Sequence, residues 1–382
     1  MRKRLTLFVL AGMLVGLALP AASLAGGDPK PGTIVSSEPM ALTATLDAVA
    51  TGKRITYRST DPNGHPIVVS GAVLTPRAEI VSSHPENAHR TVAWAHGTTG
   101  VADACAPSAT DHLDLPMYDD YTRVAAGYLS QGWTVAATDY PGLGTPGPHP
   151  YIVGASEGRS IIDSVRAARN LDPTLSDKWV VSGHSQGGQA AIFASELADT
   201  YGKGLHLRGA VALAPASNID LITPALVGTP VQGYLVMAIH GLAAVDPGVH
   251  LEEILAQPAL DRVSVLESGC FDEVMAAFGE LAPAELLVGG QFSEALAAKF
   301  AASNPGQEAA SSPVLLVQGL NDDTIPADLS RLFNSQLCAF DQPVQLTEYP
   351  GTDHMSVLPA SQGDVIDYIR ARFKKEPAPS SC

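Results

Sequence analysis

The sequence predicts an α/β protein with a mostly parallel sheet and helices on both of its faces. Short apolar runs alternate with longer stretches of helical periodicity, which is typical of repeated β-α-β units. The apolar runs are continuous rather than alternating, and this favours strands that are buried on both faces. The 382 residues are 46% hydrophobic and only 16% charged, so the chain can bury a large core and is not disordered.

Two strands are expected before the alternation begins: an edge strand at Arg54–Ser59 and a second strand at Ile67–Leu74. A polar loop at Glu79–Arg90 follows them. Gly132 and Gly202 are expected to end the helices Asp119–Ser130 and Gly187–Tyr201, since glycine commonly follows a helix C-terminus. The expected order from there is strand Thr91–Ala95, helix Asp119–Ser130, strand Trp133–Thr138, helix Ser156–Leu171, strand Trp179–Ser182, helix Gly187–Tyr201, strand Gly209–Leu213, strand Val314–Val317, helix Ala327–Ala339, strand Val344–Glu348 and helix Gln362–Lys374.

One segment, residues 218–312, interrupts this alternation because it contains no clear strand. A structureless loop of this length is improbable in a compact domain. We therefore expect a helical cap, or lid, inserted between a first core part at residues 26–217 and a second at residues 313–382. Its helical stretches are Leu251–Ala256, Glu273–Phe278, Glu285–Val288 and Ser293–Ala302.

The first 25 residues have the organisation of a signal peptide. Arg2, Lys3 and Arg4 precede an apolar run, Leu5–Leu19, and small residues follow it up to Ala25. A membrane anchor is the alternative, but a span needs about 20 apolar residues. We expect cleavage after Ala25 and a mature protein that is secreted or periplasmic.

Charge and motif content exclude several classes of function. The net charge is −16, whereas domains that bind a phosphate backbone are usually basic, so nucleic acid is not an expected partner. The chain has no GxxxxGK loop for nucleotide phosphates and no CxxC spacing for a zinc site. We expect neither a cofactor nor a metal.

Four cysteines, Cys105, Cys270, Cys338 and Cys382, all lie in the part of the chain expected to be exported. An even number of cysteines in an oxidising compartment favours two disulfides. Three pairings of the four residues are open at this point.

A candidate nucleophile follows the strand Trp179–Ser182. Residues 183–187 are Gly-His-Ser-Gln-Gly and lead into a helix, which is the strand-turn-helix setting that gives a G-x-S-x-G motif its meaning. The turn leaves little room beside the serine, so Gly183 and Gly187 avoid Cβ atoms that would clash. The motif predicts Ser185 as a nucleophile at a helix N-terminus.

A serine hydroxyl needs a general base, and in this type of fold the order along the chain is serine, acid, histidine. His354 is the only histidine after position 250 and follows the last predicted strand. The preferred acid is Asp322, in a loop whose Gly-x-x-Asp-x-x-Ile-Pro spacing resembles the acid loop of many α/β-hydrolases. Asp323 and Asp353 are alternatives. Both loops follow strand ends, where an open α/β sheet builds its site.

Attack by serine also needs an oxyanion hole, which consists of backbone N–H groups aimed at the oxygen that becomes negative. One donor is expected from Gln186, directly after the serine. The other is expected from the loop at residues 96–100, His-Gly-Thr-Thr-Gly. Thr98 and Thr99 are the candidates, with Gly100 as a further alternative.

Four short motifs lie in the first half of the chain: His96-Gly97-Thr98-Thr99-Gly100, Cys105-Ala106-Pro107-Ser108, Asp139-Tyr140-x-Gly142-x-Gly144 and Gly183-His184-Ser185-Gln186-Gly187-Gly188. Their combination resembles the secretory lipase family, the α/β-hydrolase group typified by fungal lipase A. The resemblance spans about residues 40 to 375. Each motif alone is common, but the combination is specific.

The resemblance implies an α/β-hydrolase fold with a helical cap before the acid. The nucleophile, acid and base of the family fall on Ser185, Asp322 and His354. The fungal prototype has two disulfides, which map by position to Cys105–Cys270 and Cys338–Cys382. The first would tie the cap to the loop beside the oxyanion hole, and the second would hold the C-terminal tail.

Taken together, the residues and the resemblance predict an exported serine hydrolase that cleaves carboxylic esters through an acyl-enzyme, as a triacylglycerol lipase or carboxylesterase. The expected partner is a small-molecule or lipid ester, the latter at a lipid–water interface, with no obligate protein partner. The alternative is a secreted peptidase or acyltransferase that uses the same three residues. A binding protein without activity is disfavoured, because all three residues occur in the required order.

Overall fold

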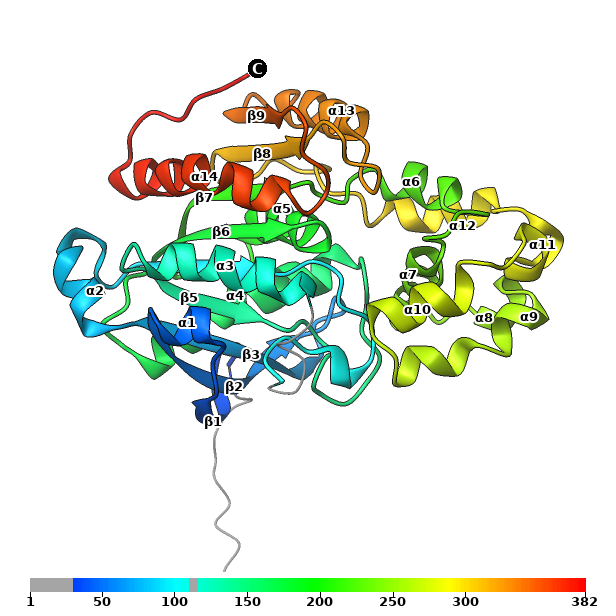
Figure 1. The fold of residues 1–382 in the computed structure, drawn as a ribbon, viewed down its shortest axis with the longest axis horizontal. Helices are drawn as coiled ribbons and strands as arrows, with labels where there is room; N and C mark the ends of the chain where they lie inside the picture. The colour runs from blue at the N-terminus through cyan, green and yellow to red at the C-terminus, as the bar shows by residue number, and fades with distance from the viewer. Residues whose placement is uncertain (1–29, 110–115) are drawn as a thin grey trace, which may run out of the picture.

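The fold is built on one sheet with the strand order β1-β2-β3-β5-β4-β6-β7-β8-β9 (Figure 1). The computed structural model describes residues 30–109 and 116–382, so the expected signal peptide lies outside the described residues. The pairs from β5 to β9 are parallel, whereas β1, β2, β3 and β5 pair antiparallel. The strands are β1 (Ile34–Met40), β2 (Ala50–Thr60), β3 (Pro66–Pro76), β4 (Thr91–Ala95), β5 (Thr134–Thr138), β6 (Lys178–His184), β7 (His206–Leu213), β8 (Val314–Gly319) and β9 (Val344–Tyr349).

Helices cover both faces of the sheet, which confirms the predicted fold class. In β4, Val92 and Trp94 pack into the core under α1, α3 and α14, while Ala93 and Ala95 pack into the core under α4, α5 and α13. Both sides of the strand are therefore buried, which explains its continuous apolar sequence. These helices are α1 (Ala44–Asp47), α3 (Pro116–Leu129), α4 (Gly154–Leu171), α5 (Gln186–Leu197), α13 (Ala327–Cys338) and α14 (Val357–Lys374).

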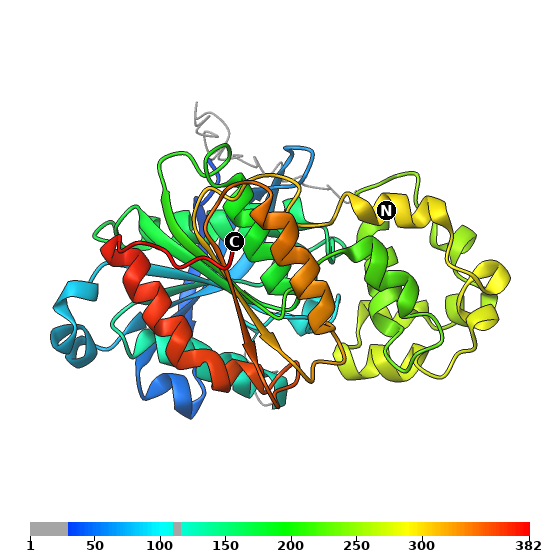
Figure 2. The same ribbon diagram turned by 90° about the horizontal axis from the view of Figure 1, so that it is seen from above.

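The chain between β7 and β8 forms a group of helices with an apolar core of its own. Leu235, Phe278 and Phe300 are fully or almost fully buried in that core. Figures 1 and 2 show these helices, coloured green to yellow, gathered beside the sheet rather than on its faces. They are α6 (Ile219–Ala225), α7 (Gly233–Ala243), α8 (Leu251–Ile254), α9 (Gln257–Leu260), α10 (Phe271–Phe278), α11 (Pro283–Leu286) and α12 (Glu294–Ala301).

The structure corrects three expectations. Arg54–Ser59 lies within β2, but β2 is not the edge strand, because β1 pairs along its outer side. The expected loop at Glu79–Arg90 contains α2 (Ala78–Ser83) and a short 3-10 turn at Pro85–Asn87. The last helix begins at Val357 rather than at Gln362. In the part of the chain that the structure describes, no helix combines the length and the apolar character needed to cross a membrane.

Candidate active site

Ser185 lies at the turn between β6 and α5, with φ 57° and ψ −118°. A positive φ is strained for a residue with a side chain, so the surroundings must hold this conformation. The Ser185 N–H donates to the Leu213 carbonyl oxygen of β7 at 2.9 Å. A Cβ on Gly183 would lie 2.0 Å from the carbonyl oxygen of Gly187, and one on Gly187 would lie 2.0 Å from that of Ala95. Only glycine therefore fits on either side of the turn.

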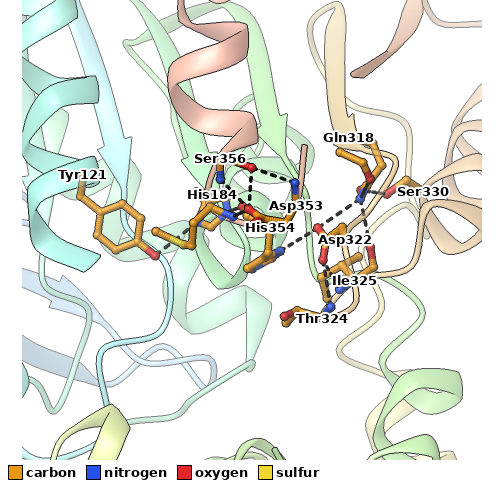
Figure 3. A network of polar contacts seen from close by, with 12 residues as sticks. Tyr121, His184, Gln318, Asp322, Thr324, Ile325, Ser330, Asp353, His354 and Ser356 are labelled. Carbon is orange, nitrogen blue, oxygen red and sulfur yellow. Dashed lines mark hydrogen bonds and ion pairs between the residues drawn. The ribbon is translucent and has the colours of Figure 1, made fainter. Parts of the chain in front are cut away.

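His354 follows β9 and meets Asp322, which follows β8. Its Nδ1 lies 2.8 Å from Asp322 Oδ2, and the side chain of Asp322 is fully buried (Figure 3). A carboxylate can only accept, so Nδ1 carries a proton, and in the neutral form of the ring Nε2 is the nitrogen with the lone pair. The two loops predicted to meet at the carboxyl edge of the sheet do so.

The carboxylate of Asp322 has further donors that fix its orientation. The backbone N–H groups of Thr324 and Ile325 donate to Oδ1 at 2.9 and 2.8 Å, and Gln318 Nε2 donates to Oδ2 at 3.1 Å. The amide of Gln318 is itself held, since its Oε1 accepts from Ser330 at 2.6 Å. Asp322 thus faces His354 in a single orientation.

The two alternative acids, Asp323 and Asp353, line the same cavity as Ser185 and His354, but the carboxylate that contacts the imidazole is that of Asp322. Asp323 is exposed, whereas Asp322, next to it, is buried. Asp353 is also exposed and accepts from the backbone N–H groups of Met355 and Ser356 and from the Ser356 hydroxyl. These contacts, with the Ser356 hydroxyl bond largest, hold the pKa of Asp353 below its ordinary value. Asp353 therefore orders the start of α14 rather than facing the imidazole of His354.

Ser185 and His354 line one open cavity of about 640 Å³. Thr98 also lines it, and the group of helices between β7 and β8 contributes Tyr234 and Phe271. Within residues 30–109 and 116–382 no hydrogen bond joins Ser185 to His354, and contacts of this kind often tighten only when substrate binds.

A smaller apolar cavity of about 50 Å³ also reaches Ser185. Helices α6 and α7 form one wall of it, and the loop after β8 contributes Ile325. Its lining includes Tyr151, Ile152, Ala216, Ile219, Ile222, Leu226, Tyr234 and Ala238. Ser185 thus lies between a wide cavity with a mixed polar and apolar lining and a narrow apolar one.

The two threonines of the 96–100 loop differ in their surroundings. Thr98 lines the larger cavity, and its hydroxyl lies 2.7 Å from the Tyr151 hydroxyl. Both threonines are buried, but Thr99 is not among the residues that line this cavity, and its carbonyl oxygen accepts from the Phe271 N–H at 2.9 Å. Gln186 is the first residue of α5, so its N–H has no partner within the helix. Thr98 and Gln186 are therefore better placed than Thr99 to face a bound carbonyl oxygen.

A buried polar cluster that the sequence did not predict binds the side chain of Gln186 through hydrogen bonds. Gln186 Nε2 donates to Glu157 Oε1 at 2.7 Å and to His149 Nε2 at 3.0 Å. Burial raises the pKa of Glu157 to about 8, although its bonds to Gln186 and Ile152 oppose this shift. Burial also lowers the pKa of His149 to about 3. His149 is therefore neutral at pH 7 and Glu157 is mainly protonated, and neither residue belongs to a motif that could have predicted it.

Two disulfides hold outlying parts of the chain. They pair Cys105 with Cys270 and Cys338 with Cys382, as the resemblance implied. Cys270 directly precedes α10, and an isolated β-bridge joins it to Gly100. The first disulfide therefore links the helices between β7 and β8 to the loop that carries Thr98.

Comparison with known proteins decides the family, because residues 118–381 match the secretory lipase family. The chain belongs to the secretory lipase family. The secretory lipases are carboxylic ester hydrolases, and so is this protein. Secreted triacylglycerol lipase LIP4 of Malassezia globosa is 25% identical over 376 residues, covering 93% of this chain and 80% of that protein.

Solved structures show that the secretory lipase fold extends over almost the whole chain. The closed state of Candida antarctica lipase A superimposes with a TM-score of 0.77 at 19% identity, covering 92% of this chain and 86% of that one. The rice cell wall degrading esterase LipA from Xanthomonas oryzae gives 0.74 at 20% identity, with 90% and 100% coverage. At these identities the likeness establishes the α/β-hydrolase fold, and the chemistry must be argued from the residues.

Proposed function

We propose that this secretory lipase hydrolyses carboxylic esters through an acyl-enzyme on Ser185, with His354 as general base and Asp322 as its partner. The observation that carries the proposal is the 2.8 Å contact between His354 Nδ1 and Asp322, in a cavity that Ser185 also lines. The tautomer of His354, its burial and its position beside the cavity all suit a base that acts on Ser185.

The proposed reaction has two steps. His354 Nε2 accepts the proton of Ser185 as its oxygen attacks the acyl carbonyl, and Asp322 stabilises the imidazolium that forms. The alcohol leaves with that proton, and an ester bond now joins the acyl group to Ser185. Water then attacks this ester with His354 again as base, releasing the acid and restoring the serine.

The oxyanion that forms in each step needs two donors. We assign them to the backbone N–H groups of Gln186 and Thr98, because Gln186 begins a helix next to the serine and Thr98 lines the same cavity. The side-chain NH₂ group of Gln186 donates to both Glu157 and His149, and these two bonds support a fixed backbone at this position.

The two cavities suit the two halves of an ester. The narrow apolar cavity lined by α6 and α7 suits the first carbon atoms of the acyl chain, and the wider, more polar one suits the alcohol. We therefore assign residues 218–312 the function of a cap, because helices of this segment line both cavities. A triacylglycerol, the substrate named for the Malassezia relative, is the largest ester we propose.

We further propose that the protein is exported after cleavage behind Ala25. The basic and apolar character of residues 1–25 supports this, as do the two disulfides, which persist in oxidising compartments. The printed name of the Malassezia relative also describes a secreted protein.

The test compares wild type with Ser185→Ala on p-nitrophenyl esters of increasing chain length, emulsified triglyceride, peptides and acyl-acceptor alcohols. We expect ester hydrolysis by wild type and none above background by Ser185→Ala, with similar thermal midpoints. Turnover by the variant would remove Ser185 as nucleophile, and faster cleavage of peptides or faster acyl transfer would favour the alternative activities. The intact mass of the secreted Ser185→Ala protein tests the cleavage after Ala25.

A further inference from the structure

A second histidine, His184, lies between the nucleophile turn and the loop of the base. It directly precedes Ser185 and is fully buried, and its ring centroid lies 4.5 Å from that of His354. His184 Nε2 lies 2.8 Å from the backbone carbonyl oxygen of His354, and Nδ1 lies 3.2 Å from the hydroxyl of Tyr121 (Figure 3). Both ring nitrogens therefore have defined partners.

These partners determine the tautomer of His184. A carbonyl oxygen only accepts, so Nε2 carries the proton and donates to His354. Nδ1 is then the acceptor for the Tyr121 hydroxyl. Burial, and to a smaller extent the nearby His354, lowers the pKa of His184 well below its ordinary value, so the ring stays neutral.

His354 is consequently held at two points from two strands. Asp322, after β8, binds the ring at Nδ1, while His184, at the end of β6, binds the backbone carbonyl oxygen. The first contact sets the direction of the imidazole, and the second sets where its backbone lies. Because Ser185 is the next residue after His184, the second contact couples the base directly to the turn that carries the serine.

The loop at residues 96–100 packs against the same pair of side chains. A Cβ on Gly97 would lie 2.1 Å from the Tyr121 hydroxyl and 3.2 Å from His184 Nδ1. Glycine at this position lets the backbone next to Thr98 contact both groups. Three loops, those of the nucleophile, the base and the proposed oxyanion donor, thus meet at the imidazole of His184.

We propose that His184, with Nε2–H bound to the His354 carbonyl oxygen and Nδ1 facing the Tyr121 hydroxyl, is a positioning residue: it holds the backbone of His354 so that the His354 Nε2 faces the Ser185 hydroxyl. The side chain of His184 is buried and acts only through His354. This inference rests on the proposed function, since it assumes that Ser185 and His354 react together.

A matched pair of variants separates the hydrogen bond from simple packing. Gln in His184→Gln can still donate to the His354 carbonyl, whereas Met in His184→Met has a similar length and no donor. Misplacement of a reacting group by an ångström can cost about 100-fold in rate, so we expect His184→Met to lose about that factor in kcat. KM should change little, and His184→Gln should recover most of the lost kcat.

Ser185→Ala, assayed beside them, separates the two proposals. Turnover by Ser185→Ala would overturn the proposed function. If Ser185→Ala is inactive, wild-type kcat in His184→Met, or equal losses in the Met and Gln variants, would overturn the role of His184 alone. Should His184→Met fail to fold, Tyr121→Phe replaces it: phosphonylation of Ser185 by a small fluorophosphonate should slow several-fold, and an unchanged rate would overturn the inference.

Discussion

Three aspartates lie close to His354 in sequence or in space, and their existing contacts separate them. Asp322 is buried and faces the imidazole, Asp353 binds backbone N–H groups at the start of α14, and Asp323 is exposed. The adjacent pair at 322 and 323 provides a matched test, because the two differ in orientation more than in chemistry.

Asp322→Asn should reduce kcat far more than Asp323→Asn. An amide at 322 can present its NH₂ group to His354, which favours the tautomer that cannot act as base, and losses of about 10⁴-fold are typical of this change. Asp323→Asn should stay within a few-fold of wild type. Steady-state kcat on one soluble ester decides the matter, and the reverse ranking of the two variants would reassign the acid.

Glu157 makes the stability of the protein depend on pH. Its folded-state pKa of about 8 lies above the ordinary value of 4.5, so the folded state holds this proton after the unfolded state has lost it. Its stabilising effect is therefore complete below about pH 4.5 and is lost as the pH rises toward 8. Glu157 Oε2 and Gln186 Oε1 are both buried without a hydrogen-bond partner among residues 30–109 and 116–382.

Glu157→Gln should flatten this pH dependence. The pKa difference corresponds to about 5 kcal/mol, of which about 4 kcal/mol falls between pH 5 and pH 9, and this is the most that ionisation of one carboxyl could remove there. Free energies of unfolding from denaturant titrations at pH 5 and pH 9 measure it in both proteins. Parallel changes in wild type and variant would show that Glu157 does not titrate in this range.

Some of the proposed site residues were predictable from sequence and others were not. Ser185 was, because glycines on both sides and a strand before it leave few other interpretations. The choice of Thr98 over Thr99 depends on which of the two lines the cavity. The buried position of Glu157 could not be predicted, since a glutamate in the first turn of a helix is ordinarily a solvated residue.

At the scale of elements, the disulfide between Cys105 and Cys270 differs from that between Cys338 and Cys382 in what it connects. The first joins the proposed cap to the loop of Thr98, where the Phe271 N–H also binds the Thr99 carbonyl oxygen. The second only holds the C-terminal tail to the end of α13. Removing each should therefore have different effects on activity.

The double variants Cys105→Ala/Cys270→Ala and Cys338→Ala/Cys382→Ala test this difference. Sequence separations of 165 and 44 residues give losses of about 5 and about 4 kcal/mol from chain entropy, so both variants should be destabilised to a similar degree. Only the first should also lower kcat/KM, by roughly tenfold, through a displaced oxyanion loop. Equal kcat/KM in the two folded variants would contradict this assignment.

Elements of the sheet were easier to predict than those of the insertion. The strands β4 to β9 are short apolar runs between helices, whereas β1 was missed because most of its side chains are exposed and it contains serine, glutamate and proline. Helix α7 was also missed, because its sequence GYLVMAIHGLA is apolar around almost its whole circumference and has no amphipathic period.

At the scale of the whole molecule, the arrangement of strands and helices could be predicted from the sequence, whereas the contacts between loops could not. The parallel order of β4 to β9 follows from alternating strands and helices, and it brings loops distant in sequence to one edge. What sequence patterns could not supply were contacts between those loops, such as that of His184 with His354 or of Gln186 with Glu157. These depend on side-chain packing in the folded protein.

The position of β8 and β9 in the chain has a consequence for the timing of activity. Asp322 and His354 both follow the long insertion, so the serine is synthesised well before its acid and base. A chain that crosses a membrane N-terminus first carries Ser185 across before either partner. In the proposed export, a partly translocated chain therefore carries the proposed nucleophile across before the acid and base that we assign to it, and the proposed site is complete only once β8 and β9 have joined the sheet.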